Sequence, residues 1–293
     1  MYHPENQYLE LIDKILKEGE LRTTRNGNTY SLFGERLVFE VGQYGFPLLT
    51  TKRVFLRGII EELLWFLRGD TNAKYLSNNG VKIWDGNSTR AFLDSRGLDY
   101  PEGECGPIYG YQWRCFNGEY PTRTGGIDQI HYVLNELITN PTGRRALFTG
   151  WNPQQLDAMA LPPCHVLYEF YISNKGLSCM MVQRSADFIL GVPFNIASTT
   201  LLTTIFAHII GIPLDKIIIC LGDTHIYEAH VEGAKEQLNR VPYDFPSVKI
   251  TKDAPPKESS IDEKIKWIET LKYEDFVVAD YKYHPSIKFE MMA

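Results

Sequence analysis

Hydrophobic positions at the start of the chain recur first at helical spacing and then at strand spacing. Apolar residues from Tyr8 to Leu16 fall on one face of a helix, and Gly19 follows them as a stop signal. Apolar and polar residues then alternate from Tyr30 to Val41, which predicts a strand. The chain therefore opens with an amphipathic helix and a half-buried strand.

A second apolar run carries two carboxylates. Residues Ile59 to Leu67 predict a buried helix that Gly69 closes, and Glu61 and Glu62 interrupt its apolar sequence. A helix that is apolar almost all round is buried on most sides. We therefore expect one of the two carboxylates to point inward.

The remaining pattern mixes helices and strands. It predicts, in order, a helix over 126–139, strands over 145–152, 165–173 and 177–184, a long helix from about 194, a strand over 215–222 and a helix over 226–239. Ser260 and Glu263 match the capping box of a late helix. Residues 82–125 are irregular, a length that suggests a functional insert or lid. The mixture predicts an α+β fold and, without repeats or a Pro/Ser-rich linker, a single domain over residues 1–293.

Composition narrows the class of protein. The 293 residues are 44% hydrophobic and 23% charged, which excludes disordered and collagen-like chains. A net charge of −6 argues against a general nucleic-acid or membrane-surface binder, so an anionic ligand needs a local basic cluster. The uncharged run from Phe188 to Leu214 is long enough to raise the question of a membrane span, but Pro193, Asn195 and His208 interrupt it. We expect a buried core helix there.

The cysteines and the first residues bear on the compartment. The start of the chain has neither the basic nor the apolar region of a secretory signal, so we expect a cytoplasmic protein. The cysteines are odd in number and include no Cys-x-x-Cys pair, which disfavours a disulfide scaffold. We expect five free thiols: Cys105, Cys115, Cys164, Cys179 and Cys220.

One of these thiols lies where a hairpin would give it a cationic neighbour. If Asn174 and Lys175 form a two-residue turn, Cys164 faces Ser185 across the hairpin and Arg184 flanks it. A guanidinium that lowers a thiol pKa from about 8.5 to about 7 raises the thiolate fraction at neutral pH from roughly 3% to roughly 50%. Cys164 is then a usable nucleophile. The alternative is a small buried hydrophobe, the common fate of an intracellular cysteine.

Two adjacent arginines suggest a place for an anion. Arg144 and Arg145 lie on a predicted strand, where neighbours point to opposite faces, so at most one serves a given pocket of its own chain. With Arg184 and Ser185 they would complete a phosphate cradle, and surface salt bridges are the alternative. The sequence contains no P-loop, no G-x-G-x-x-G after a strand and no H-E-x-x-H, so neither ATP, NAD nor a metal is indicated.

At this point the residues resemble the thymidylate synthase family, in blocks that keep the family order over nearly the whole chain. The blocks are Phe46–Arg53, Glu61–Phe66, Gly106–Arg114, Met159–His165 with its Pro-Pro-Cys-His, Gln183–Asp187, Leu190–Ser198 and Gly222–Tyr227. Trp84–Asp94 also resembles the insert of the eukaryotic-type enzymes, which would account for the irregular stretch.

The resemblance implies the fold, the reaction and the assembly. It implies the thymidylate synthase fold, with a mixed sheet packed by helices, and a homodimer. The enzyme that it implies is a methyltransferase that would convert dUMP to dTMP, with 5,10-methylenetetrahydrofolate as donor of both the one-carbon unit and the hydride, and that would need no metal, NAD, membrane or nucleic acid. Cys164 would add to C6 of the uracil and make C5 nucleophilic.

The resemblance also assigns residues to dUMP. Arg144 and Arg145 would come from the partner subunit, which removes the difficulty of their opposite strand faces. Asn195 would bind O4 and N3–H of uracil, since a carboxamide offers an acceptor beside a donor; a helix N-cap is its alternative role. The implied dUMP set is Arg25, Arg144, Arg145, Gln183, Arg184, Ser185, Asp187, Asn195, His225 and Tyr227.

Proton transfer and the folate are assigned in the same way. Glu62, with a pKa raised by its apolar helix, would relay protons through water, and Tyr109 and His165 would join that water network. Without the resemblance, Glu62 is as easily a carboxylate satisfied by a neighbouring Arg or Trp. The implied folate set is Ile83, Trp84, Asn87, Asp187, Leu190, Gly191, Phe194, Tyr227, Met291 and Ala293, the last two as part of a closing lid.

The sequence also departs from the family pattern. The loop that carries Arg25 is one residue shorter than usual, and Arg22 is a competing candidate for the same role. Other positions differ outside the chemistry, and these changes bear on packing or on the dimer interface: Glu169, Val182, Thr199 and Thr200.

Three other functions remain at this stage. A pyrimidine hydroxymethylase of the same superfamily would capture the methylene with water, and Asn195 and Trp84 favour the synthase over it. A Cys–His hydrolase would pair Cys164 with His165, but adjacent strand residues diverge. A nucleotide- or RNA-binding regulator without turnover is opposed by the acidic charge balance.

Overall fold

The computed structural model describes residues 2–292 and contains one large mixed sheet. The sheet has six strands in the order β1-β2-β6-β5-β4-β3, and only the β5–β6 pair is parallel. Its strands are β1 (Glu20–Thr24), β2 (Gly27–Phe39), β3 (Leu147–Thr149), β4 (His165–Ser173), β5 (Gly176–Asp187) and β6 (Leu214–Tyr227). A separate ribbon pairs β7 (Ser247–Ile250) with β8 (Phe276–Ala279). The expected mixed sheet is confirmed.

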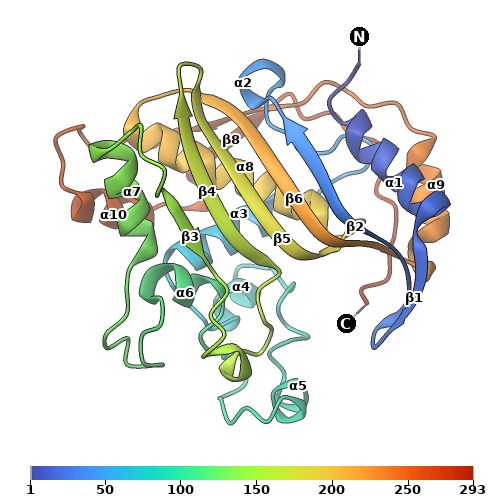
Figure 1. Ribbon diagram of the computed structural model, residues 1–293, viewed down its shortest axis with the longest axis horizontal. Helices are drawn as coiled ribbons and strands as arrows, with labels where there is room; N and C mark the ends of the chain where they lie inside the picture. The colour runs from blue at the N-terminus through green and yellow to red at the C-terminus, as the bar shows by residue number, and fades with distance from the viewer. Residues whose placement is uncertain (1, 293) are drawn as a thin grey trace.

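Helices pack on this sheet and on one another (Figure 1). The α-helices are α1 (Asn6–Glu18), α2 (Val41–Tyr44), α3 (Leu56–Leu67), α4 (Lys74–Asn78), α5 (Arg90–Ser95), α6 (Tyr109–Cys115), α7 (Gln129–Thr139), α8 (Gly191–Ile210), α9 (Val231–Leu238) and α10 (Ile261–Glu269). Short 3-10 helices are η1 (Leu156–Ala158), η2 (Glu228–His230) and η3 (Tyr273–Asp275). The capping box of Ser260 and Glu263 begins α10 as expected.

Helix α8 is the centre of the core. It packs against β5 and β6 on one side and against α3 on the other. Among residues 2–292 it is the one helix long and apolar enough to cross a membrane, but 72% of its apolar window is buried inside the fold. The expectation of a buried core helix is confirmed.

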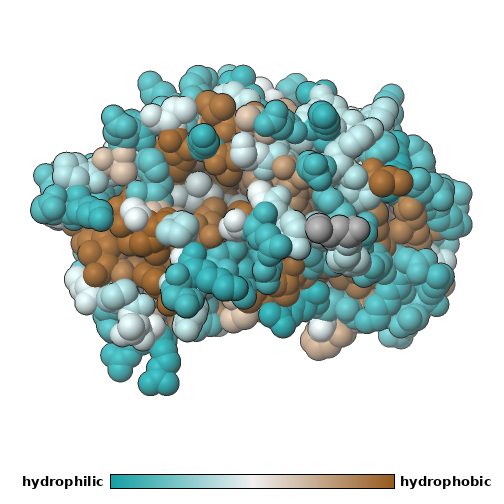
Figure 2. All heavy atoms as spheres, turned by 90° about the horizontal axis from the view of Figure 1, so that it is seen from above, coloured by the Kyte–Doolittle hydropathy of each residue, from teal (hydrophilic) through white to brown (hydrophobic). Residues whose placement is uncertain are grey.

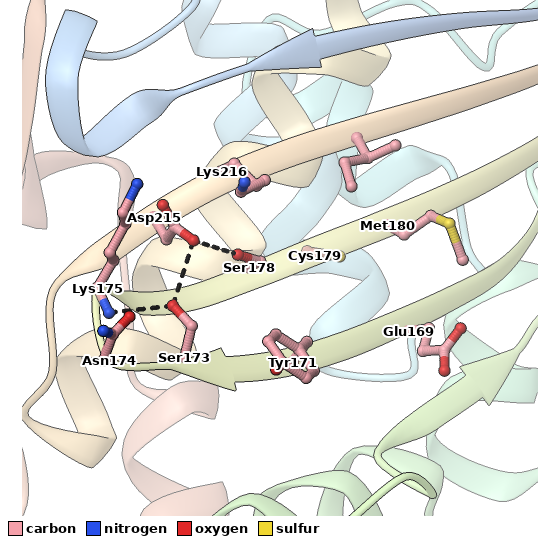
Figure 3. A pocket seen from close by; sticks show the side chains of 11 residues that line it. Glu169, Tyr171, Ser173, Asn174, Lys175, Ser178, Cys179, Met180, Asp215 and Lys216 are labelled. Atoms are coloured by element: carbon pink, nitrogen blue, oxygen red, sulfur yellow. Dashed lines mark hydrogen bonds between the residues drawn. The ribbon is translucent and has the colours of Figure 1, made fainter. Parts of the chain in front are cut away.

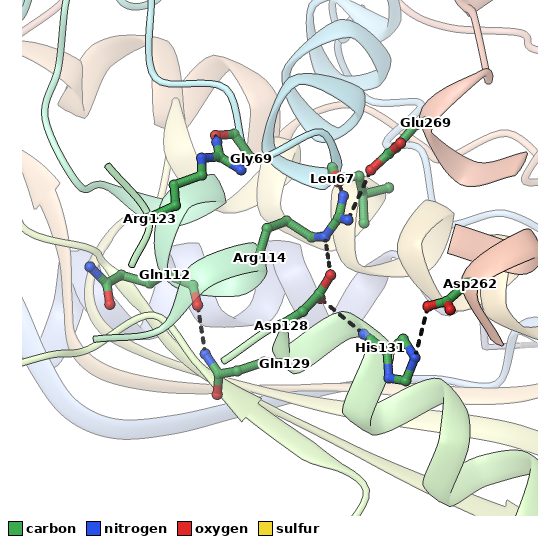
Figure 4. A network of polar contacts seen from close by, with 10 residues as sticks. All are labelled: Leu67, Gly69, Gln112, Arg114, Arg123, Asp128, Gln129, His131, Asp262 and Glu269. Atoms are coloured by element: carbon green, nitrogen blue, oxygen red, sulfur yellow. Dashed lines mark hydrogen bonds and ion pairs between the residues drawn. The ribbon is translucent and has the colours of Figure 1, made fainter. Parts of the chain in front are cut away.

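A polar network around Arg114 joins helices α3, α6, α7 and α10 (Figure 4). Arg114 of α6 donates to the carbonyl of Leu67 at the end of α3, to Asp128 at the start of α7 and to Glu269 of α10. Its side chain is only 9% exposed, so its charge is compensated inside the fold. Gly110 lets α6 approach closely, because a Cβ there would lie 2.7 Å from the Phe66 carbonyl oxygen. The network therefore fixes α6 against α3.

Several predicted boundaries were wrong. β6 continues through Tyr227, so the helix predicted over 226–239 begins only after the strand, as η2 and α9. The strand predicted over 145–152 is the short β3, and Arg144 and Arg145 lie in the bend before it. The irregular stretch 82–125 contains the helices α5 and α6. Pairing to neighbouring strands, which no local pattern records, decided these ends.

The β4–β5 hairpin keeps the predicted turn but not the predicted register at its far end. Ser173 pairs with Gly176, which confirms the two-residue turn. A bulge between His165 and Leu167 then shifts the pairing by one residue. The carbonyl of Cys164 consequently accepts from the backbone N–H of Arg184 (2.9 Å), and the expected position opposite Ser185 is wrong.

Candidate active site

Cys164 lies immediately before β4 and is braced from two sides. The Arg184 side chain extends from β5 to the segment before β4, where Nε donates to the Pro163 carbonyl (2.9 Å) and Nη2 to the Pro162 carbonyl (3.2 Å). Its guanidinium also lies 5.1 Å from the centroid of the Trp151 ring. The backbone N–H of Cys164 donates to the Tyr109 hydroxyl oxygen (2.6 Å). The thiol is therefore held at a fixed strand end.

The electrostatics of Cys164 differ from the expectation. Burial raises the pKa of its thiol above the usual value, and the Arg184 charge and a hydrogen bond from Tyr109 oppose that rise. The expected net lowering to about 7 is wrong, because desolvation of the thiolate outweighs one solvent-exposed guanidinium. Arg184 still acts in the predicted direction, and Tyr109 adds a second lowering contribution that the sequence did not predict.

Glu62 of α3 faces the same region. Its Oε1 accepts a hydrogen bond from Trp84 Nε1 (2.7 Å), so Trp84 satisfies the carboxyl as one reading anticipated. Burial raises the pKa of Glu62 to about 7, and the Trp84 bond opposes the rise. Glu61 has a smaller exposed fraction than Glu62, 6%, but the charges of Arg57 and Arg68 lower its pKa and oppose the rise caused by burial. Glu62 is the carboxyl suited to exchange protons at neutral pH.

His165, which follows Cys164 in the chain, forms a side-chain hydrogen bond with Asn195 of α8. His165 is buried, its Nδ1 lies 3.2 Å from the Tyr168 hydroxyl, and its ring packs against Tyr109. Burial lowers the pKa of His165 to about 4, and a hydrogen bond from His165 to the Asn195 side chain opposes the shift. A base with that pKa is a poor acceptor for the proton of Cys164, which argues against the Cys–His hydrolase.

Asn195 lies inside α8 and does not cap it. The N-cap position is Leu190, so the alternative role as N-cap is wrong. The Thr199 hydroxyl donates to the Asn195 carbonyl (2.7 Å), and Thr200 makes the same bond one residue on. The two threonines that depart from the family pattern thus bond to the helix backbone and not to the side-chain amide of Asn195.

The end of β5 forms the turn into α8. Asp187 Oδ1 accepts from the backbone N–H groups of Ile189 and Leu190, both at 3.0 Å. Gly191 and Phe194 follow in the first helical turn. Trp84 lies across the site, with its ring 6.0 Å from Tyr109, and the neighbouring half-buried members of the predicted folate set are Ile83 and Asn87.

The two residues that the resemblance assigns to the ribose, His225 and Tyr227, both lie on β6, which continues beyond the predicted strand. His225 and Tyr227 alternate along the strand with their ring centroids 5.3 Å apart. Asp223 Oδ1 bonds to Nδ1 of His225 at 2.9 Å, which fixes the ring. Burial raises the pKa of Tyr227, while a hydrogen bond from Asn26 and the charge of Arg25 lower it. Arg25 therefore lies near Tyr227.

The anion-binding candidates are partly assembled. Arg22 pairs with Asp223 (2.7 Å), whereas Arg25 is exposed in the β1–β2 turn, which favours Arg25 as the free cation of this loop. Gln183 is buried, its Nε2 donates to the Ser185 carbonyl (3.0 Å), and its Oε1 has no partner within residues 2–292. Ser185 itself is half-buried beside it.

Arg144 and Arg145 are not brought to Cys164 within the chain. The N–H of Phe170 donates to the carbonyl of Ala146, so the two arginines lie level with the far half of β4. About six strand residues, roughly 20 Å, separate that level from Cys164. Both arginines are exposed, and neither forms an ion pair with a described residue.

Comparison with known proteins gives the family. The thymidylate synthase family model matches residues 6–293. The chain belongs to the thymidylate synthase family. It is 47% identical to thymidylate synthase of Agaricus bisporus, over 99% of both chains, and 48% identical to that of Homo sapiens, over 99% of this chain and 91% of the relative. It also matches a bifunctional dihydrofolate reductase-thymidylate synthase of Paramecium tetraurelia at 48% identity, and spans 61% of that longer protein.

Membership in the thymidylate synthase family confirms the expected class of enzyme. The chain is a methyltransferase for conversion of dUMP to dTMP, and 5,10-methylenetetrahydrofolate is its co-substrate. The comparisons do not favour the hydroxymethylase or the RNA-binding regulator. Within residues 2–292 no group of three or more His, Cys, Asp or Glu could hold a metal.

Sequence reasoning missed Lys52, a buried cation of this thymidylate synthase site. Its Nζ donates to the carbonyl of Ile189 (2.5 Å), in the turn that Asp187 also holds. Burial lowers the pKa of Lys52 to about 7, and the charges of Asp187 and Glu5 oppose the shift. Glu5 in turn accepts four hydrogen bonds from residues 50–51. Lys52 lies inside the matching block Phe46–Arg53, so its place in that block was the available signal.

Proposed function

We propose that this chain makes dTMP from dUMP through a covalent bond between Cys164 Sγ and C6 of uracil. The observation that carries the proposal is the position of the thiol at the start of β4, with Arg184 and Tyr109 both favouring the thiolate. The proposal assigns the surrounding polar groups to the ring, the ribose and the phosphate. These assignments rest on the positions of the side chains described above.

The proposed reaction begins at the thiolate. Sγ bonds to C6, the C5–C6 double bond opens, and the electron pair is shared by C5 and O4. C5 then bonds the methylene carbon of the folate, and loss of the C5 proton breaks the bond from that carbon to the folate nitrogen, which leaves an exocyclic methylene. Hydride from the tetrahydrofolate adds to this methylene to give the methyl group, as the folate is oxidised to dihydrofolate. Release of the Cys164 thiolate restores the double bond. A covalent intermediate of this kind divides one difficult step into easier ones.

Asn195 and Glu62 would divide the recognition and proton transfer at the ring. The Asn195 amide, buried and hydrogen-bonded to His165, offers a donor to O4 and a second acceptor position to N3–H. Glu62, with a pKa of about 7, would hold and return a proton through water near O4. His165 would remain neutral and orient the Asn195 amide.

We further propose that two copies of this chain form a dimer across the outer face of the sheet. Residues that alternate with the core-facing ones on β4, β5 and β6 are half-buried and largely apolar there: Leu167, Met180, Val182, Ile218 and Cys220. A hollow of about 460 Å³ lies on these strands, and one of its lining residues, Tyr171, is 64% exposed. Figure 3 shows how the side chains that line it lie. In the view from above, apolar atoms also gather in patches between hydrophilic surroundings (Figure 2). A second copy would cover this face and bring Arg144 and Arg145 to the phosphate.

The reaction is tested by turnover with a matched inactive variant. Purified protein is assayed for dihydrofolate formation and for dTMP with dUMP and 5,10-methylenetetrahydrofolate together. We expect both products, and neither with Cys164→Ala. The Cys115→Ala variant, which removes a buried free thiol outside the dimer face and outside the proposed reaction, is the matched control and should remain active. Hydroxymethyl product without dihydrofolate would refute the synthase reaction.

The sharing of arginines is tested by complementation. Cys164→Ala lacks the nucleophile, and a double variant with Arg144→Ala and Arg145→Ala lacks the donated charges, so each homodimer should be nearly inactive. Mixed dimers hold one intact site, and random exchange should restore roughly a quarter of wild-type activity. No recovery in a mixture whose exchange is shown by mass would contradict donation across the interface.

A further inference from the structure

The end of the chain is seated by three residues that the proposed reaction does not use. We call residues 281–292, which form no helix or strand, the C-terminal strap. The ring of Phe289 in this strap lies 5.3 Å from the ring of His230 and 4.8 Å from Lys52 Nζ. Gly233 completes the seat, because a Cβ there would lie 2.4 Å from Phe289 Cε1. The seat therefore fits a large ring only while residue 233 is glycine.

His230 binds the backbone of the strap as well as its side chain. It is fully buried, and its Nε2 lies 2.6 Å from the Glu290 carbonyl oxygen. A carbonyl oxygen only accepts, so Nε2 carries the proton. Nδ1 is buried with no partner among residues 2–292. A buried nitrogen without a hydrogen-bond partner costs free energy, which the other contacts of the His230 ring must offset.

The His230 ring also contacts Tyr227, which the proposed function assigns to substrate binding. The centroid of His230 lies 5.5 Å from that of Tyr227, at an interplanar angle of 75°. Beyond His230 the strap continues to Gly27, where a Cβ would lie 3.3 Å from Met292 Cε, and Arg25 and Asn26 precede that glycine. The strap therefore contacts two neighbours of Tyr227: His230, whose ring lies against it, and Gly27, which follows the Asn26 that bonds to it.

We propose that His230 is a positioning residue that ties the C-terminal strap to the Tyr227 wall of the substrate site. The inference rests on the proposed function for the role of Tyr227 and of the strap end in ligand binding. Its structural part, the tie itself, does not depend on turnover. His230 donates to the Glu290 carbonyl, supports the Phe289 ring and contacts Tyr227. A displacement of the end of the strap is therefore coupled to a displacement of Tyr227.

The tie is tested first without ligands, by digestion of the strap with a carboxypeptidase. His230→Phe keeps a ring between Tyr227 and Phe289 and removes the N–H donor, so one hydrogen bond of net value near 1 kcal/mol is lost. We expect release of the terminal residues about fivefold faster than in the wild type. His230→Gln retains a donor and should restore most of the wild-type rate.

A matched control and a second perturbation make the result specific. His284→Phe removes a similar bond, from His284 Nε2 to the Val241 carbonyl (2.8 Å), at the other end of the strap, and it keeps the ring stacked on Tyr243. It should leave the release rate unchanged. Gly233→Ala displaces Phe289 without altering His230 and should accelerate release. Wild-type release rates in both His230→Phe and Gly233→Ala would overturn the proposal.

Steady-state kinetics then connect the tie to the site. His230→Phe should raise KM for 5,10-methylenetetrahydrofolate about fivefold, and His230→Gln should reverse most of the rise. An equal fall of kcat in both variants with unchanged KM would overturn the positioning role. Cys164→Ala should show the wild-type release rate, so failure of the proposed chemistry and failure of the tie give different results.

Discussion

The pKa of Glu62 leads to a quantitative prediction about stability. The folded-state pKa of about 7 lies above the ordinary value of 4.5, because burial disfavours the charged carboxylate. A raised acid pKa means that the folded state holds the proton more tightly than the unfolded chain. The stability that Glu62 contributes is therefore complete below pH 4.5, and it is lost as the pH rises from 4.5 through 7.

Glu62→Gln removes this titration and keeps an acceptor for Trp84 Nε1. From pH 5 to pH 8, the pKa difference should cost the wild type about 2.5 kcal/mol of unfolding free energy that the variant does not lose. The assay is urea unfolding of both proteins at pH 5 and pH 8, at one protein concentration. Glu102→Gln, at an exposed position, is a control that should follow the wild type.

The result that would refute this reasoning is equal pH dependence in wild type and Glu62→Gln. Such a result would mean that the carboxyl is hydrated in the folded state and that its pKa is ordinary. The same variant should also lower kcat, by roughly 100- to 10,000-fold for loss of a general acid–base group. If Glu62→Gln loses the pH dependence of the unfolding free energy but keeps full activity, Glu62 has no part in the proposed proton transfer.

Three further predictions concern the nucleophile and the nucleotide. Tyr109→Phe removes a hydrogen bond that lowers the pKa of Cys164, so alkylation of the thiol by iodoacetamide at pH 7.5 should slow, and an unchanged rate would contradict the contact. Asn195→Asp should favour dCMP over dUMP in competition binding, since a carboxylate or its acid suits the cytosine edge; retained preference for dUMP would argue against the amide contact. Arg25→Ala should raise KM for dUMP about tenfold, whereas Arg22→Ala should raise it less than twofold; the reverse order would transfer the role to Arg22.

Local patterns predicted most of the elements that bear the site. The turn at Asn174 and Lys175 and the helix of Glu62 follow from turn chemistry and apolar periodicity, which act over a few residues. The register at Cys164 did not follow, because the bulge after His165 depends on how β4 meets β5 over its whole length. The end of β6 at Tyr227 likewise depends on pairing with β2.

The pKa shift of Cys164 was predicted only in part, because it too depends on contacts between distant parts of the chain. The sequence places Arg184 beside Cys164, and that neighbour lowers the thiol pKa as expected. Burial of the thiol is a property of the folded chain, and it reverses the net shift. Lys52 shows the same limit, since its contact with Ile189 joins residues 137 positions apart. Matching family blocks identified where the site lies, and packing determines its charges.

The most direct test of the central claim is a search for the bond from Cys164 to the pyrimidine. Fluorine in place of hydrogen at C5 blocks the loss of a proton, so 5-fluoro-dUMP with 5,10-methylenetetrahydrofolate should stop the reaction at the covalent stage. Intact-protein mass spectrometry should then show addition of nucleotide plus folate, and peptide mapping should place it on Cys164. Turnover of dUMP by a protein that forms no such adduct, or an adduct on any other residue, would contradict the account.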